Sequence, residues 1–176
     1  TADNNTAVGY SSLTANTTGT NGVAIGFQAS LSNTTGGQNT SLGWNAFGTN
    51  TTGSDNTALG KRALHASTTA SNNTAVGANS LLLNTTGASN TAVGTYSLDA
   101  NTTASNNTGI GYSALGVNTT GAQNIAVGGG ALEANTTAND NTGVGYAALA
   151  LNTTGAQNTA LGAYALYANT TGANNT

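Results

Sequence analysis

Most side chains of this sequence that could take part in chemistry belong to asparagine and threonine, and they recur as Asn-Thr-Thr. An asparagine two residues before a threonine or serine is the acceptor pattern for N-linked glycans, and threonine hydroxyls can carry O-linked ones. The same residues also form tight corners, because their amides and hydroxyls satisfy backbone groups. We favour the corner interpretation and keep glycosylation as the alternative. The candidate acceptors in Asn-Thr-Thr are Asn16, Asn33, Asn50, Asn84, Asn101, Asn118, Asn135, Asn152 and Asn169. The acceptor pattern recurs outside Asn-Thr-Thr at Asn4, Asn39, Asn72, Asn106 and Asn174.

The groups that perform catalysis or bind metals are few and scattered. The one histidine, His65, follows Lys61 and Arg62, and we expect it to be a solvated surface residue. Acid–base catalysis and divalent metals need several groups at one place, but the carboxylates occur singly, and cysteine is absent from the sequence. We predict no catalytic residue, metal site or cofactor, and therefore no enzyme. The carboxylates are Asp3, Asp55, Asp99, Glu133 and Asp140.

Aromatic side chains occur intermittently and allow two interpretations. They could form a stripe that binds sugars or a partner, or they could shield strand edges and fill grooves between chains; we favour the second. The glycine triplet 128–130 we interpret as a flexible corner. The aromatic residues concerned are Tyr10, Phe27, Trp44, Tyr96, Tyr112, Tyr146 and Tyr164.

The composition excludes several classes of protein. Only 4% of the residues are charged and 37% are hydrophobic, so a conventional packed core is not expected. The net charge of −3 and the two basic residues argue against nucleic-acid binding. No apolar run is long enough to span a membrane, and we detect no signal peptide at Thr1.

These residues are carried by a repeat of 17 residues. Asparagine recurs at this interval from Asn5 to Asn175, with Gly22 in the one gap, and ten full periods cover residues 5–174. The consensus is N-T-A-V-G-x-x-A-L-x-A-N-T-T-G-x-x, and we number its positions 1 to 17 from Asn5. Partial periods continue the phase at both ends, so residues 1–176 are predicted to form a single array.

Each position of the repeat carries physical information. Position 5 is always glycine, which indicates a positive φ or a contact too close for a side chain. Positions 2 and 4 carry threonine and an aliphatic residue, and their alternation predicts a strand whose shared face is at least partly buried. The charged residues fall at positions 6, 7, 10, 16 and 17, which we expect to face solvent.

A unit of this size cannot bury its own apolar face, so successive units must stack. Helical hairpin repeats need roughly 30 residues or more, and glycine, asparagine and threonine are weak helix formers. We predict an all-β fold, a parallel β-solenoid or β-roll with one coil per repeat. At about 4.8 Å per coil, ten coils give a rod of roughly 50 Å.

The segment Asn-Thr-Ala-Val-Gly, at 5–9, 73–77 and 90–94, resembles the head repeats of trimeric autotransporter adhesins. The longer unit, as at 107–120, is similar to repeats of phage tail-fibre and bacterial surface proteins. The resemblance covers essentially the whole chain. It implies a left-handed parallel β-roll, a trimeric state and a role in surface attachment. The unit differs from the adhesin heads in its added Asn-Thr-Thr corner.

We therefore expect a structural protein, a segment of an extracellular fibre, appendage, adhesin shaft or virion fibre. The thin core favours association of the chain with itself, as a homotrimer or a filament. Surface glycans are a further candidate partner. The alternative function is an ice-binding or glycan-binding solenoid that uses its threonine and asparagine ladders.

Overall fold

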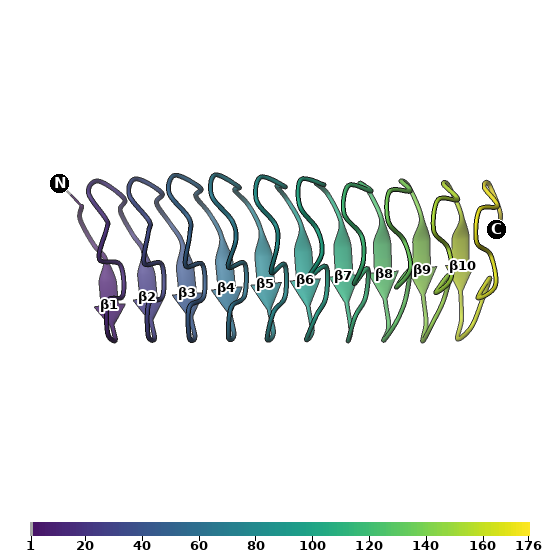
Figure 1. The fold of residues 1–176 in the computed structure, drawn as a ribbon, viewed down its shortest axis with the longest axis horizontal. Helices are drawn as coiled ribbons and strands as arrows, with labels where there is room; N and C mark the ends of the chain where they lie inside the picture. The colour runs from purple at the N-terminus through teal and green to yellow at the C-terminus, as the bar shows by residue number, and fades with distance from the viewer. Residues whose placement is uncertain (1) are drawn as a thin grey trace.

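The computed structural model describes residues 2–176 as one straight rod of stacked coils (Figure 1). Each repeat contributes one strand of three residues, at positions 2 to 4. The ten strands form one sheet in chain order, and all neighbours pair in parallel, residue i with residue i+17. The prediction of a parallel β-solenoid is confirmed. The strands are β1 Thr6–Val8, β2 Val23–Ile25, β3 Thr40–Leu42, β4 Thr57–Leu59, β5 Thr74–Val76, β6 Thr91–Val93, β7 Thr108–Ile110, β8 Ile125–Val127, β9 Thr142–Val144 and β10 Thr159–Leu161.

The return path of each coil is also hydrogen-bonded to the next coil, although it contains no strand. The backbone N–H of Leu98 donates to the carbonyl of Ala114 at 3.0 Å, and that of Thr102 donates to Thr119 at 3.0 Å. Backbone bonds therefore join neighbouring coils around the whole circumference, which fixes every coil in the same register.

The core is built from three ladders of side chains, the small residues of positions 3 and 8 and the leucine of position 9. Position 3, mostly alanine, points inward from the sheet, and the position 9 leucine reaches it from the return path. In the interior coils both are fully buried, as Ala92 and Leu98 illustrate. The small residue is required because the two layers nearly touch: a Cβ on Gly109 would lie 2.6 Å from Oγ of Ser97 and 3.3 Å from Cγ of Leu98.

Positions 2 and 4 share a partly buried face, as expected, and this face lies on the outside of the rod. The opposite face, which carries the position 3 alanine, is fully buried. The aliphatic residue of position 4 is partly exposed in every coil. The sequence pattern could not identify the inner face, because the narrow interior accepts alanine, whereas size alone would assign valine to the core.

The invariant glycine at position 5 is required both by its backbone conformation and by its neighbour. Gly60 has a φ of 135°, and a Cβ there would lie 2.6 Å from the carbonyl oxygen of Gly77 in the next coil. A side chain in such a ladder would collide with the backbone above it, as predicted from the sequence.

Leucine at position 9 adopts a left-handed backbone, as do positions 7 and 17. In the sixth coil these residues are Leu98, Tyr96 and Asn106, with φ of 51°, 58° and 62°. A left-handed residue other than glycine costs roughly 1–2 kcal/mol. Burial of a leucine side chain contributes about 1.5–3 kcal/mol, which offsets that cost at position 9.

Two ladders of buried asparagine fill the other end of the interior, at positions 1 and 12. The Nδ2 group of Asn107 donates to the carbonyl of Gly121 at 2.8 Å, and that of Asn118 donates to the same carbonyl at 2.8 Å. The Oδ1 atom of Asn107 accepts the backbone N–H of Asn124 at 2.9 Å, and Asn118 bonds Asn101 at 3.2 Å. The asparagines thus tie each corner to its own coil and to its neighbours.

Serine interrupts the leucine ladder of position 9 and the asparagine ladder of position 12 at one place each. Ser30 occupies the leucine position of the second coil, and its hydroxyl lies 2.9 Å from that of Ser41, at position 3 of the third coil. Ser67 replaces asparagine at position 12, and its buried hydroxyl has no hydrogen-bond partner. The first substitution is compensated by a second one, whereas the other leaves a gap in the asparagine ladder.

We predict that Ser67→Asn raises the free energy of unfolding by about 1–2 kcal/mol, because the new amide would supply two or three hydrogen bonds to buried groups. The measurement is the midpoint of chemical denaturation. Thr69→Asn, at an exposed position of the same coil, is the control and should change the midpoint little. Equal midpoints for the two variants would show that ladder continuity does not contribute to stability.

Candidate functional site

The Asn-Thr-Thr asparagines lie inside the rod. Asn50, Asn84 and Asn118 are 0% exposed, and only the end-coil members Asn16 and Asn169 are half-buried. The nitrogen to which a glycan would be attached, Nδ2, donates to the position 15 carbonyl in each of these coils, at 2.8–3.0 Å for the interior three. This geometry favours the corner interpretation, and glycosylation of the nine Asn-Thr-Thr asparagines stays the alternative to be tested.

The two threonines of each corner point in different directions. The position 13 hydroxyl bonds the next coil: Thr85 Oγ1 donates to the carbonyl of Thr102 at 2.9 Å. The position 14 side chain, as in Thr86 and Thr103, is exposed in every coil. Only one of the two threonine rows is therefore free to meet a ligand.

Exposed acceptor asparagines occur at position 17, and they allow an internal control. Asn72 and Asn106 precede Asn-Thr and are exposed, whereas the position 12 asparagines are enclosed. We predict that the chain, when it is secreted from a glycosylating host, carries no glycan on the position 12 asparagines. Any N-linked glycan should be attached to an asparagine at position 17. Peptide mass spectrometry checks this, and a glycan found on Asn101 or Asn118 would contradict the corner interpretation.

The outer face of the sheet carries two parallel rows of side chains, threonine at position 2 and an aliphatic residue at position 4. Leu42 is 49% exposed and Ile110 is 39% exposed. The aliphatic row continues over all ten strands, which gives a contiguous apolar ridge along the rod. Exposed apolar patches of this kind mark interaction surfaces.

The aromatic residues of the first three coils form a stack along one edge of the rod. Tyr10, Phe27 and Trp44 all occupy position 6, and their ring centroids are separated by 5.3 and 6.5 Å in sequence order. In the fourth coil position 6 is Lys61, whose Nζ lies 5.7 Å from the centroid of the Trp44 ring. The aromatic row thus ends in a cation–π contact.

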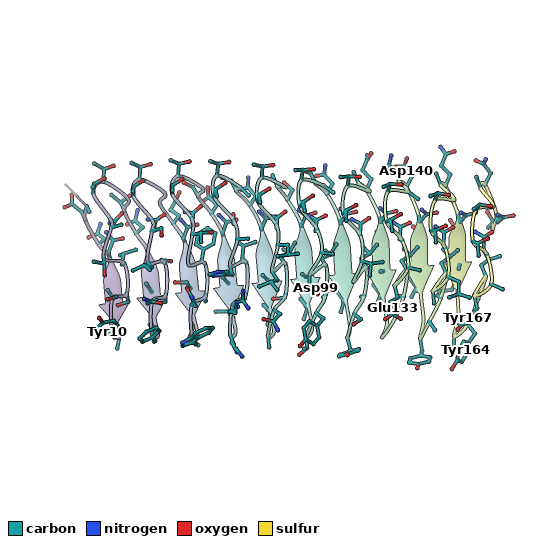
Figure 2. All side chains as sticks on the ribbon, in the orientation of Figure 1. Tyr10, Asp99, Glu133, Asp140, Tyr164 and Tyr167 are labelled. Atoms are coloured by element: carbon teal, nitrogen blue, oxygen red, sulfur yellow. The ribbon has the colours of Figure 1, made fainter. Side chains whose placement is uncertain are left out.

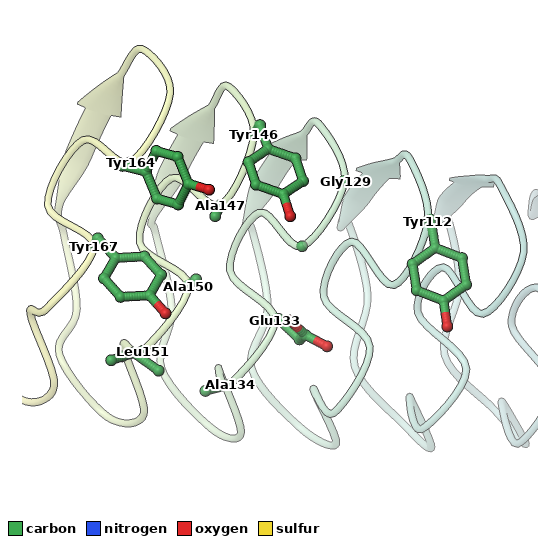
Figure 3. Close-up of a pocket in the computed structure, with 11 residues that line it drawn as sticks. Tyr112, Gly129, Glu133, Ala134, Tyr146, Ala147, Ala150, Leu151, Tyr164 and Tyr167 are labelled. Atoms are coloured by element: carbon green, nitrogen blue, oxygen red, sulfur yellow. The ribbon is translucent and has the colours of Figure 1, made fainter.

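A groove of about 410 Å³ lies on the same edge near the other end of the rod (Figure 3). Figure 2 places Glu133, Tyr164 and Tyr167 on this edge, opposite Asp140. We call this the tyrosine groove. Its main lining residues are Tyr112, Gly129, Glu133, Tyr146, Tyr164 and Tyr167.

The sequence contains the parts of the tyrosine groove but does not indicate that they meet. From the sequence alone Glu133 is an isolated carboxylate, the glycine triplet is a flexible corner, and Tyr167 has no feature that distinguishes it. The structure places Gly129 and Gly130 between the aromatic side chains and the carboxylate. The signal in the sequence is the pair of glycines at positions 6 and 7, one coil from a tyrosine on either side.

Outside the tyrosine groove, the ionisable side chains with shifted pKa values are His65 and Asp99. Residues 2–176 contain no cluster of histidine and carboxylate groups that could bind a metal ion. His65 is half-buried, not fully solvated as expected: its Nδ1 lies 3.2 Å from the carbonyl oxygen of Asn45. Burial lowers the pKa of His65, the Asn45 bond opposes this change, and the Arg62 charge adds to it. For the Asp99 carboxyl, burial has the opposite effect and raises the pKa, because it disfavours the charged form.

The lowered pKa of His65 predicts a dependence of stability on pH. As the pH falls through about 6.5, the unfolded chain takes up a proton before the folded chain does, so stability is lost until the folded-state pKa is passed. We expect a loss of less than about 1 kcal/mol between pH 7.5 and 5.5, because the ring is half exposed. Denaturation midpoints of the natural chain and His65→Gln at each pH test this, since the variant should lack that component.

Comparisons of the chain with protein-family models, with curated proteins and with solved structures find no match. Within residues 2–176 there is no helix that could cross a membrane.

Proposed function

We propose that this chain is a rigid segment of an extracellular fibre, appendage or adhesin shaft. The observation that carries this proposal is the continuity of the inter-coil bonds. The backbone ladders and the two asparagine ladders repeat at the 17-residue interval through the rod. Bending or unwinding one coil would break bonds to both neighbours, so repetition gives stiffness and sets length.

The partner that we propose is a second copy of the same chain. The outer sheet face presents an apolar ridge of leucine, isoleucine and valine, and association would remove it from water at roughly 25 cal/mol per Å². The uncharged strands suit this contact, because the sheet carries no ionised side chain that would need a partner when buried. The homotrimer and the filament are both compatible with it.

Electron cryomicroscopy of the purified chain tests this proposed function. We expect elongated particles or continuous fibres with a layer line at about 4.8 Å, the spacing of hydrogen-bonded strands. Compact particles that stay single chains at all concentrations would contradict the proposal.

A charged variant of the sheet face tests self-association. The variant carries three lysines on the ridge, one in every second coil: Leu59→Lys, Val93→Lys and Val127→Lys. The three ammonium groups should raise the dissociation constant of the assembly, measured by sedimentation, at least tenfold. The matched control is Thr69→Lys, Thr103→Lys and Thr137→Lys, which adds the same charge at exposed positions of the same coils. If both variants or neither dissociate, the sheet face is not the interface.

Ice binding stays a second candidate because of one feature of the sheet. Threonine at position 2 and the aliphatic residue at position 4 alternate along the strands of all coils except the second and eighth, where Val23 and Ile125 replace threonine, so their methyl groups form a nearly regular two-dimensional array. Thermal hysteresis of the soluble chain measures this activity. A substantial value that Thr91→Lys abolishes would place ice binding ahead of the fibre.

A further inference from the structure

Position 6 forms one row of side chains along the edge of the rod, and this row is interrupted at the eighth coil. Tyr112 and Tyr146 occupy the row in the seventh and ninth coils, and Gly129 stands between them. Two coil spacings put the attachment points of the two tyrosines about 9.6 Å apart. Because Gly129 has no side chain, the space above it stays open between two tyrosine positions of the row.

The rod itself contains a precedent for what such a row binds. In the fourth coil the residue that follows the aromatic stack is Lys61, and its ammonium group lies against the Trp44 ring. A ligand ammonium group above Gly129 would lie at position 6 of its coil, as Lys61 does. It would have a tyrosine in the coil on either side, whereas Lys61 has a tryptophan on one side.

The charge of the tyrosine groove favours a cation. Glu133 is the one ionisable acid among its lining residues, and its Oε2 lies 3.3 Å from where a Cβ on Gly130 would stand. The Tyr146 ring lies 3.6 Å from the corresponding point of Gly129. The two glycines therefore leave the carboxylate and the ring face open to the same space. The only lysine and arginine of the chain, Lys61 and Arg62, lie four coils away.

The far wall of the groove has the geometry of an aromatic cage. Tyr146 and Tyr164 meet edge to face, with centroids 5.4 Å apart and an angle of 77° between the rings. Tyr164 and Tyr167 do the same at 5.6 Å and 68°. Rings set at steep angles to one another surround a compact group, whereas coplanar rings would offer a flat platform for a sugar ring.

We propose that the tyrosine groove binds an organic ammonium group, preferably a methylated one, as found in choline-type head groups and methylated lysine side chains. The tyrosine rings surround the methyl groups, and Glu133 neutralises the charge. This site is additional to the proposed rod function and does not depend on it.

Titration of the full chain with choline, followed by tyrosine fluorescence or by NMR of the tyrosine rings, tests the proposal. We expect a dissociation constant on the order of 1 mM, because the groove is open to water. The control ligand is 3,3-dimethylbutan-1-ol, which has the shape of choline without its charge and should bind at least about tenfold more weakly. Equal binding of the two compounds, or binding of a neutral disaccharide in place of choline, would overturn the proposal.

Two substitutions locate the site on the chain. Glu133→Gln keeps the shape of the side chain and should weaken choline binding about tenfold, with less effect in high salt. Gly129→Lys places a tethered ammonium in the slot, by analogy with Lys61, and should abolish binding. Ala78→Lys, in the same position of the fifth coil and away from the groove, should leave binding unchanged. Loss of binding in Ala78→Lys, or its retention in Gly129→Lys, would place the ligand elsewhere.

Discussion

Every coil must present the same polar atoms at the same height as its neighbour, and the rest of the structure depends on this requirement. The buried amides of Asn107 and Asn118 are satisfied because each has a corner carbonyl in its own coil and an asparagine in the next. An insertion of a single residue would shift these donors away from their acceptors and leave buried groups unpaired. The constant 17-residue spacing is therefore the condition under which a polar interior can exist.

This requirement separates the rod into constrained and variable parts. The interior positions and the glycine ladder admit almost no change, because each contact is repeated by the coil above. At the edge positions 6, 7 and 10 the backbone keeps its bonds to neighbouring coils, but the side chains lie outside the asparagine and leucine ladders. There the coils differ most: Trp44 next to Lys61 in one place, Gly129 next to Glu133 in another. A uniform scaffold can thus carry local binding chemistry without loss of regularity, since a substitution on the edge leaves the ladders intact.

The sequence predicts the scaffold well, because each period repeats the same information. The strand at positions 2 to 4, the glycine of position 5 and the corner role of Asn-Thr-Thr all follow from residue type and spacing. Which face of the strand is fully buried could not be predicted. The separation between sheet and return path is set by the left-handed leucine at position 9, and leucine has no preference for that conformation that could be recognised in the sequence. The tyrosine groove also depends on tertiary contacts: Tyr112, Glu133 and Tyr146 are far apart along the chain and meet only after the coils stack.

The buried pair Ser30 and Ser41 makes two of the coils different from the rest of the array. In a chain of near-identical repeats, two segments that are one period out of step would form almost the same contacts, and a growing stack could skip or trap a coil. The serine pair distinguishes the second and third coils from all others, because a slipped arrangement would set one hydroxyl against alanine and the other against leucine or phenylalanine. A single polar contact therefore makes the correct order of assembly energetically distinguishable from its nearest misfolded competitors, in the way that a buried asparagine fixes the alignment of a coiled coil.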